Sequence, residues 1–93
     1  MPSLPIERGD GSDKGRVEWR DEVIVRQYRF VALGYDLGKS GADGSYGDAT
    51  AAAVEKFAAT EKLPGPGGAA YDGDVIDGLI ETRMLARYIQ ART

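Results

Sequence analysis

The sequence contains neither cysteine nor histidine, and the two absences exclude several kinds of chemistry. Without cysteine the chain can form no disulfide and offers no thiol nucleophile. Without histidine it lacks the commonest general base, the Ser-His and Cys-His catalytic pairs, and the usual zinc ligands. A catalyst would have to depend on carboxylates, lysine or tyrosine alone. We therefore expect no enzyme activity, no metal site and no cofactor.

The chain also lacks a basic surplus and a long hydrophobic run. Its net charge is −3 and its isoelectric point is near 4.8, whereas nucleic-acid-binding domains carry excess Lys and Arg. An acidic chain is likewise repelled by anionic lipid surfaces. No stretch reaches about 18 apolar residues, so membrane insertion is not expected. The acidic charge likewise makes nucleic-acid binding unexpected. The first 15 residues lack the pattern of a Sec signal, which predicts a protein made in the cytoplasm.

Hydrophobic periodicity divides the chain into helices and loops. Apolar residues recur at three- and four-residue steps in three segments, which predicts helices over 17–34, 48–62 and 75–92. Glycine and proline concentrate between these segments, so 35–47 and 63–74 are predicted to be loops. The apolar arc of the first helix is wide, as in a helix that is buried between two partners.

The predicted fold class is all-α, a compact three-helix domain with two Gly-rich loops. Residues 17–93 would form this domain, and residues 1–16 would form a flexible N-terminal arm because they lack helical or strand periodicity. An alternative is that the arm docks onto the domain. Leu4 and Ile6 favour this alternative, since they are spaced for one face of an extended strand.

The most specific pattern spans residues 43–57, Asp-Gly-x-Tyr-Gly-x-x-Thr-x-x-Ala-Val-x-x-Phe. It resembles the signature of the type-1 peptidoglycan-binding family of three-helix modules. The resemblance covers roughly residues 23–80, because Leu-Gly-Tyr ends the first predicted helix and a second Asp-Gly step stands at 72–73. The sequence departs from the family pattern at Arg26, Ala58, Ile76 and Leu79. The resemblance therefore implies the fold more directly than it implies a ligand, since one fold can serve several functions.

The two Asp-Gly steps, at 43–44 and 72–73, bracket the middle helix. Each is predicted to make a tight turn in which the Asp carboxylate accepts a backbone N–H and the glycine takes an unusual φ. Tyr46 would anchor the preceding loop against the core. Thr50 would use its hydroxyl to satisfy free backbone groups at the start of the helix.

Aromatic and acidic residues in the loops are the candidate ligand contacts, since exposed tyrosines stack on sugar rings. They are Tyr35, Asp43, Tyr46, Tyr71 and Asp72. Each also has a structural interpretation as a turn residue, an anchor or a cap on the small core. The acidic stretches 10–15 and 71–78 lack the twelve-residue spacing of a calcium loop. A bundle of this size also offers little room for the cleft of a two-carboxylate glycosidase.

The resemblance implies non-catalytic binding of peptidoglycan or a related cell-surface polysaccharide, in a shallow groove. The alternative is a structural adaptor, or a spike or tail component of a phage-like particle, because such domains occur in phages. This component would use the fold for protein–protein attachment and host-envelope recognition. Its partners would then be a cell-wall or capsular glycan and other subunits held through the N-terminal arm. The expected location is a virion, a phage-like particle or the cell envelope.

Overall fold

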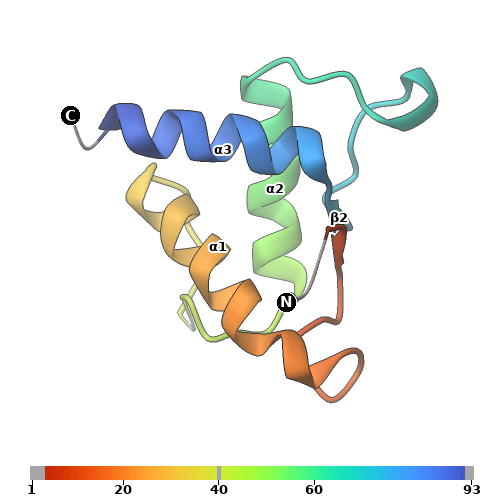
Figure 1. The fold of residues 1–93 in the computed structure, drawn as a ribbon, viewed down its shortest axis with the longest axis vertical. Helices are drawn as coiled ribbons and strands as arrows, with labels where there is room; N and C mark the ends of the chain where they lie inside the picture. Colours follow the sequence, from red (N-terminus) through yellow and green to blue (C-terminus); the bar gives the residue numbers. More distant parts are fainter. Residues whose placement is uncertain (1–3, 40, 92–93) are drawn as a thin grey trace.

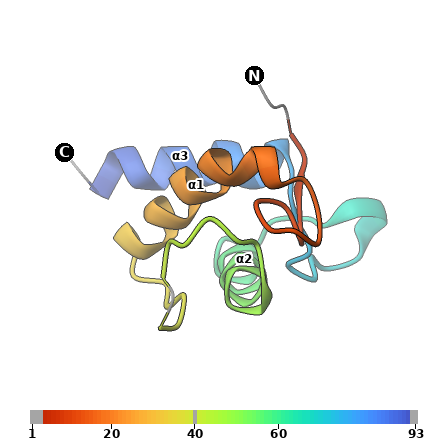
Figure 2. The ribbon, with the colours of Figure 1, turned by 90° about the horizontal axis from the view of Figure 1, so that it is seen from below.

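The computed structural model describes residues 4–39 and 41–91. Its α-helices within these residues are α1 (Arg20–Ala32), α2 (Asp48–Thr60) and α3 (Gly78–Ala91). The remaining elements are two 3-10 helices, η1 (Val17–Trp19) and η2 (Pro66–Gly68), and two strands, β1 (Ile6–Glu7) and β2 (Val75–Ile76). In Figure 1, α3 runs across α2, and α1 lies to the lower left of them. Figure 2 shows α1 lying in front of α3 with α2 below them.

The hydrophobic core lies where the three helices and the small sheet meet. Its largest fully buried apolar side chains are Tyr46, Phe30, Phe57, Ile6, Ile76, Ile80 and Met84. These residues come from all three helices, both strands and the 35–47 loop. None of the helices in the described part of the chain has the length and apolar character to cross a bilayer.

The all-α prediction is wrong, because the chain also forms a two-stranded antiparallel sheet. Ile6 of β1 stands opposite Ile76 of β2, and Glu7 stands opposite Val75. Both isoleucines are only 1% exposed. The third helix consequently begins at Gly78 rather than at residue 75, since Val75 and Ile76 give their backbone to the sheet. Hydrophobic spacing could not separate these two residues from the helix because a two-residue strand has no period of its own.

The prediction of a flexible arm is also wrong for residues 4–16, and the docking alternative is confirmed. Ile6 is buried, and Leu4 packs against the core. Backbone bonds continue past the strand, from Gly9 N–H to the Tyr46 carbonyl (2.8 Å) and from Tyr46 N–H to the Asp10 carbonyl (3.0 Å). Residues 1–3 of the predicted arm lie outside the described residues.

An ion pair between a buried carboxylate and a partly exposed arginine fixes the turn that follows β1. Asp10 is 3% exposed and accepts hydrogen bonds from Arg16 Nε (2.8 Å) and Nη2 (2.6 Å). It also accepts one from the backbone N–H of Glu7 at 2.6 Å. Burial by itself would raise the pKa of Asp10, but the hydrogen bonds from Arg16 and Glu7 lower it below its usual value. The Arg16 guanidinium in turn lies 3.6 Å from the ring centroid of Trp19, which ties this turn to the start of α1.

Two helices end in the same hydrogen-bonded motif. After α1, Gly34 has φ +94°, and the N–H groups of Gly34 and Tyr35 donate to the carbonyls of Val31 and Phe30. This is a Schellman motif, and it confirms the predicted stop at Gly34. After α2, the N–H groups of Lys62 and Leu63 make the same pair of bonds, to Ala59 and Ala58. Here a lysine occupies the left-handed position, with φ +57°.

Replacing Lys62 with glycine is expected to raise the free energy of unfolding by about 1 kcal/mol, because glycine takes this φ without a Cβ clash. Urea denaturation of the two proteins measures the change. The matched control is Lys56→Gly, which makes the same change inside α2 and is expected to destabilise by about 1 kcal/mol. An unchanged or lower stability of Lys62→Gly would contradict the prediction.

Candidate functional site

The two Asp-Gly turns form as the sequence predicts. Ser45 N–H donates to Asp43 Oδ1 at 2.9 Å, and Asp74 N–H donates to Asp72 Oδ1 at 3.0 Å. The glycine that follows each aspartate has φ +87°. Both aspartates therefore hold their own turns, and this use of one oxygen limits what each carboxylate can offer a ligand.

Gln27 of α1 holds the first turn against α2. Its Oε1 accepts the Gly44 N–H at 2.8 Å, and its Nε2 donates to Thr50 Oγ1 (2.9 Å) and to the Ser45 carbonyl (3.1 Å). Gln27 is 1% exposed, and a buried amide of this kind needs all of its partners. The structure thus gives the Thr50 hydroxyl a different role from the one predicted, since it accepts a hydrogen bond from α1. The sequence signal for this network is one polar residue in the apolar stripe of the first helix.

Tyr46 connects the first Asp-Gly turn to the second. Its ring is 1% exposed, and its hydroxyl donates to the Gly73 carbonyl at 2.5 Å. Burial, and then the negative charge of Asp74, raises the pKa of Tyr46 well above its usual value. The predicted anchoring role of Tyr46 is therefore confirmed.

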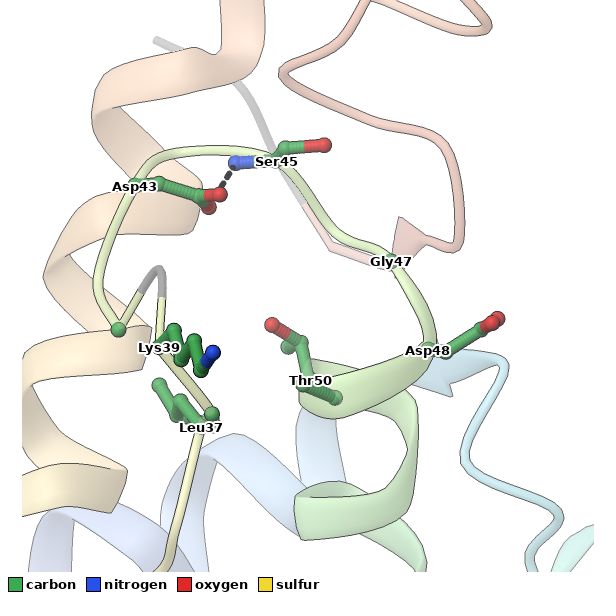
Figure 3. A pocket seen from close by; sticks show the side chains of 10 residues that line it. Leu37, Lys39, Asp43, Ser45, Gly47, Asp48 and Thr50 are labelled. Carbon is green, nitrogen blue, oxygen red and sulfur yellow. Dashed lines mark hydrogen bonds between the residues drawn. The ribbon is translucent and has the colours of Figure 1, made fainter.

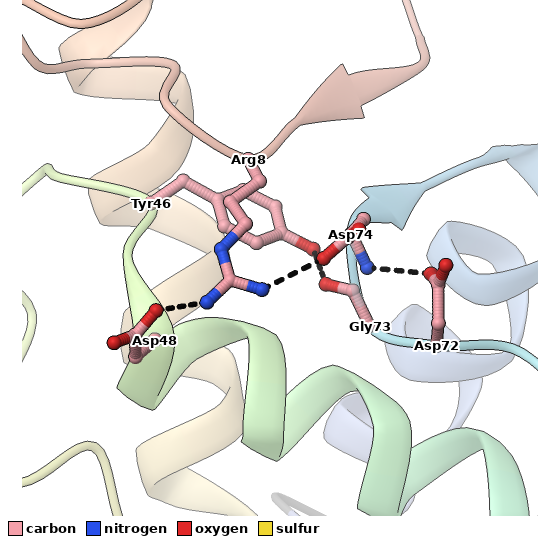
Figure 4. A network of polar contacts seen from close by, with 6 residues as sticks. All are labelled: Arg8, Tyr46, Asp48, Asp72, Gly73 and Asp74. Carbon is pink, nitrogen blue, oxygen red and sulfur yellow. Dashed lines mark hydrogen bonds and ion pairs between the residues drawn. The ribbon is translucent and has the colours of Figure 1, made fainter.

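A surface ion pair network covers the Tyr46 contact (Figure 4). Arg8 Nη1 donates to Asp74 Oδ1 at 2.8 Å, and Arg8 also pairs with Asp48 at the start of α2. Arg8 follows β1 directly, so the N-terminal segment, the start of α2 and the second turn meet at one guanidinium. These pairs are solvent-exposed and contribute little stability individually.

Two hollows flank the segment 45–48, which leads from the first turn into α2. The first, of about 240 Å³, lies between this segment and residues 37–39 and 41 (Figure 3). Its lining includes Lys39, Asp43 and Ala49. The second, of about 430 Å³, lies on the other side of the segment, against residues 8–14. The two hollows share Ser45, Gly47 and Asp48 in their linings.

The five predicted ligand contacts do not converge on one surface. Asp43 lines the first hollow and Tyr46 the second, while Tyr71 and Asp72 line a third hollow of about 310 Å³ beside β2. Tyr35 lines none of these three and instead packs edge-on against Phe30 and Phe57, with ring centroids 5.9 and 5.8 Å away. Tyr46 and Tyr71 are 1% and 7% exposed, so neither ring presents an open face to a sugar. Glycan contact by these residues stays a prediction.

The buried hydroxyl of Tyr71 is expected to make the protein less stable at alkaline pH. Its hydroxyl donates to Asp77 Oδ2 at 2.6 Å, and burial, followed by that hydrogen bond, raises its pKa to about 12. In the unfolded chain the tyrosine loses its proton near pH 10. The contribution of Tyr71 to the free energy of unfolding is therefore complete below pH 10 and is lost as pH rises towards 12. Unfolding free energy measured from pH 9 to 12 should therefore fall, and less steeply in Tyr71→Phe. Tyr28→Phe, which removes an exposed phenol, is the control, and an equal decline in both variants would contradict this prediction.

The described residues hold no group of three or more acidic side chains placed to bind a metal ion. Glu61 accepts hydrogen bonds from Arg87 (2.8 Å) and Arg83 (3.2 Å), and these arginines lower its pKa despite the opposing effect of burial. The carboxylates in these contacts act as hydrogen-bond acceptors that hold turns and helices together.

A stretch of 60 residues, 64% of this chain, is 37% identical to a type VI secretion system spike protein. That protein is VgrG3 of Vibrio cholerae serotype O1, and the stretch amounts to 6% of its length. The chain is thus similar to one small part of a much longer polypeptide. No family model matches the chain, and no solved structure matches it. This similarity favours the predicted alternative, a spike component of a phage-like particle, over glycan binding.

Proposed function

We propose that this chain is a small, non-catalytic domain of a spike-type or phage-like delivery assembly. The observation that carries the proposal is its 37% identity, over 60 residues, to a type VI secretion system spike protein. The domain acts by attachment, presenting surfaces to other subunits and to the envelope of a target cell. It works in the assembled particle.

The geometry supports attachment rather than catalysis. The sequence has no histidine or cysteine, and its best-defined polar groups are committed to the fold: Gln27, Tyr46, Asp43 and Asp72 all hold turns. The segment 44–46 is held by hydrogen bonds to α1, to the N-terminal segment and to the second Asp-Gly turn. These contacts keep its exposed surface in one shape. Such preorganisation lowers the entropic cost of binding a partner.

The proposal is tested in the organism that encodes the chain. An epitope-tagged copy is expected to sediment with the spike particles when these are purified from culture fluid by ultracentrifugation. A cytoplasmic protein with the same tag serves as the control for leakage. Recovery of the tagged chain only in the non-sedimenting fraction, while the particles themselves are recovered, would overturn the proposal.

A second candidate function is recognition of peptidoglycan or a related surface polysaccharide, which the family resemblance implies. The observation that favours it is the pair of hollows along residues 45–48, about 240 and 430 Å³ in volume. Small-molecule sites are concave and use a few placed polar groups, such as hydroxyls and charged side chains, to orient the ligand. Lys39, Asp43 and Asp48 supply charged groups here, and Ser45 supplies a hydroxyl.

Filling the first hollow separates this candidate from simple attachment. Ala49 is exposed and lines the hollow, whereas Ala52 is exposed on the same helix and does not line it. Ala49→Trp is expected to reduce co-sedimentation of the purified protein with wall sacculi at least about tenfold, and Ala52→Trp is expected to leave it unchanged. Absence of sedimentation of the unaltered protein, or equal effects of the two variants, would exclude this site.

A further inference from the structure

Beyond its first turn, the solvent-facing side of α1 is apolar. Val25, Tyr28 and Val31 are 41%, 63% and 46% exposed, and they follow one another at three-residue steps. Ile24, half-buried, and Ala32, exposed, lie on the same side of the helix. Most solvent-facing helix surfaces carry charged and polar residues instead. An apolar stripe of this kind marks an interaction surface.

The opposite side of the same helix is fully occupied. Its buried residues are Val23, Arg26, Gln27 and Phe30. The sequence predicted a helix that is buried between two partners, and the fold supplies both on this side, since Phe30 packs against Phe57 of α2 and Arg26 pairs with Glu81 of α3. In Figure 1, α1 forms the lower left margin of the molecule, with α2 and α3 on its other side. Figure 2 agrees, because α1 lies in front of α3 and no labelled element covers its outer side.

We propose that this side of α1 is a self-association surface, which pairs with α1 of a second copy of the chain in antiparallel orientation. The charges at its ends favour that occupant. Asp21 is exposed near the N-terminal end, and Arg29, whose side chain is 23% exposed, lies about two turns later with a 3.7 Å contact to Glu81. Antiparallel helices that cross between Val25 and Tyr28 place Asp21 of each copy within reach of Arg29 of the other.

This arrangement is self-complementary, as a twofold interface requires. Val25 of one copy packs on Tyr28 of the other, and the ion pairs form twice. The helix dipoles oppose one another in the antiparallel pair, which is the favourable orientation. A parallel pair would instead bring two Asp21 carboxylates together.

The association is weak in dilute solution. A single pair of 13-residue helices buries less surface than the roughly 1,200–2,000 Å² of a stable complex. A dissociation constant on the order of 100 µM is therefore expected. Tethering several copies in one particle would raise their effective concentration into the millimolar range and hold the pair together.

Sedimentation velocity between about 10 µM and 1 mM tests the proposal on the full chain. The average mass is expected to rise from that of the 10.0 kDa monomer towards twice that value. Tyr28→Glu is expected to weaken association at least about tenfold, by burying a charge in the apolar contact. Ile89→Glu is the matched control, because Ile89 is a similarly exposed apolar residue (58%) on α3. Both substitutions are on the surface, so their thermal transitions should match that of the unaltered protein.

Orientation is tested with single cysteines, which are unambiguous in a chain without native cysteine. A mixture of Asp21→Cys and Ala32→Cys proteins is expected to form disulfide dimers faster than Asp21→Cys alone, because antiparallel pairing brings opposite ends together. A protein that stays monomeric at 1 mM, or a Tyr28→Glu variant that associates like the unaltered protein, would overturn the proposal. Faster cross-linking of Asp21→Cys with itself would overturn the antiparallel geometry. A monomeric chain that still enters the spike particle would leave the proposed function standing.

Discussion

Replacing Gly73 with alanine is expected to destabilise the fold by about 3 kcal/mol or more, the sum of backbone strain and overpacking. Gly73 has φ +87°, and a Cβ at this position would lie 2.0 Å from the Ala51 carbonyl oxygen. That oxygen belongs to the backbone of α2 and cannot move aside without disturbing the helix. The substitution also displaces the Gly73 carbonyl that accepts the Tyr46 hydroxyl. Urea denaturation, followed by circular dichroism, measures the loss.

Gly34→Ala separates the two causes. Gly34 has a similar φ of +94°, but a Cβ there would meet no atom within 4 Å. Only backbone strain applies, so a loss of about 1 kcal/mol is expected. If both variants lost the same amount, the close approach of Gly73 to α2 would have no energetic consequence, and overpacking could not account for the loss.

Replacing Gln27 with leucine is expected to cost about 3 kcal/mol, although the two side chains are similar in size. Leucine would leave the buried Gly44 N–H without its acceptor. The Ser45 carbonyl and the Thr50 hydroxyl would lose their donor as well. Each buried polar group without a partner costs about 1–3 kcal/mol. Chemical denaturation at neutral pH provides the measurement.

A double-mutant cycle with Thr50→Val tests whether the network itself causes the loss. Thr50 is 3% exposed and shares a 2.9 Å hydrogen bond with Gln27. Removing both partners is less costly than the sum of the single losses, since neither then leaves the other unpaired. Strict additivity of the two substitutions would show that Gln27 contributes through packing alone.

The sequence predicted the helices and turns well where a short local pattern specifies them. The helices at 20–32 and 48–60 fall inside the predicted ranges, and Gly34 ends the first of them. The two Asp-Gly turns depend only on neighbouring residues, so their hydrogen bonds could be anticipated. The Schellman motif after α2 was hidden, because a lysine stands where glycine is the usual signal.

Long-range features were not predictable in the same way. The pairing of Ile6 with Ile76 joins residues 70 positions apart, and each strand is too short to show alternation. Tyr71 lies in a glycine-rich loop, a position that suggests exposure, yet it is buried and its hydroxyl reaches Asp77. The candidate site was therefore predicted as one surface, whereas the fold distributes its residues over separate hollows and the core. Only Asp43 of the five lies on the wall of the first hollow.

The β1–β2 pairing has a consequence for the order in which this protein folds. β1 precedes all three α-helices along the chain and leaves the ribosome before them, but its partner strand is made almost 70 residues later. Closing so long a loop carries an entropic cost that contacts between neighbouring helices do not. During synthesis Ile6 therefore stays without its partner strand until Ile76 has been made. The strand that is made before the helices becomes one of the last elements to reach its native position.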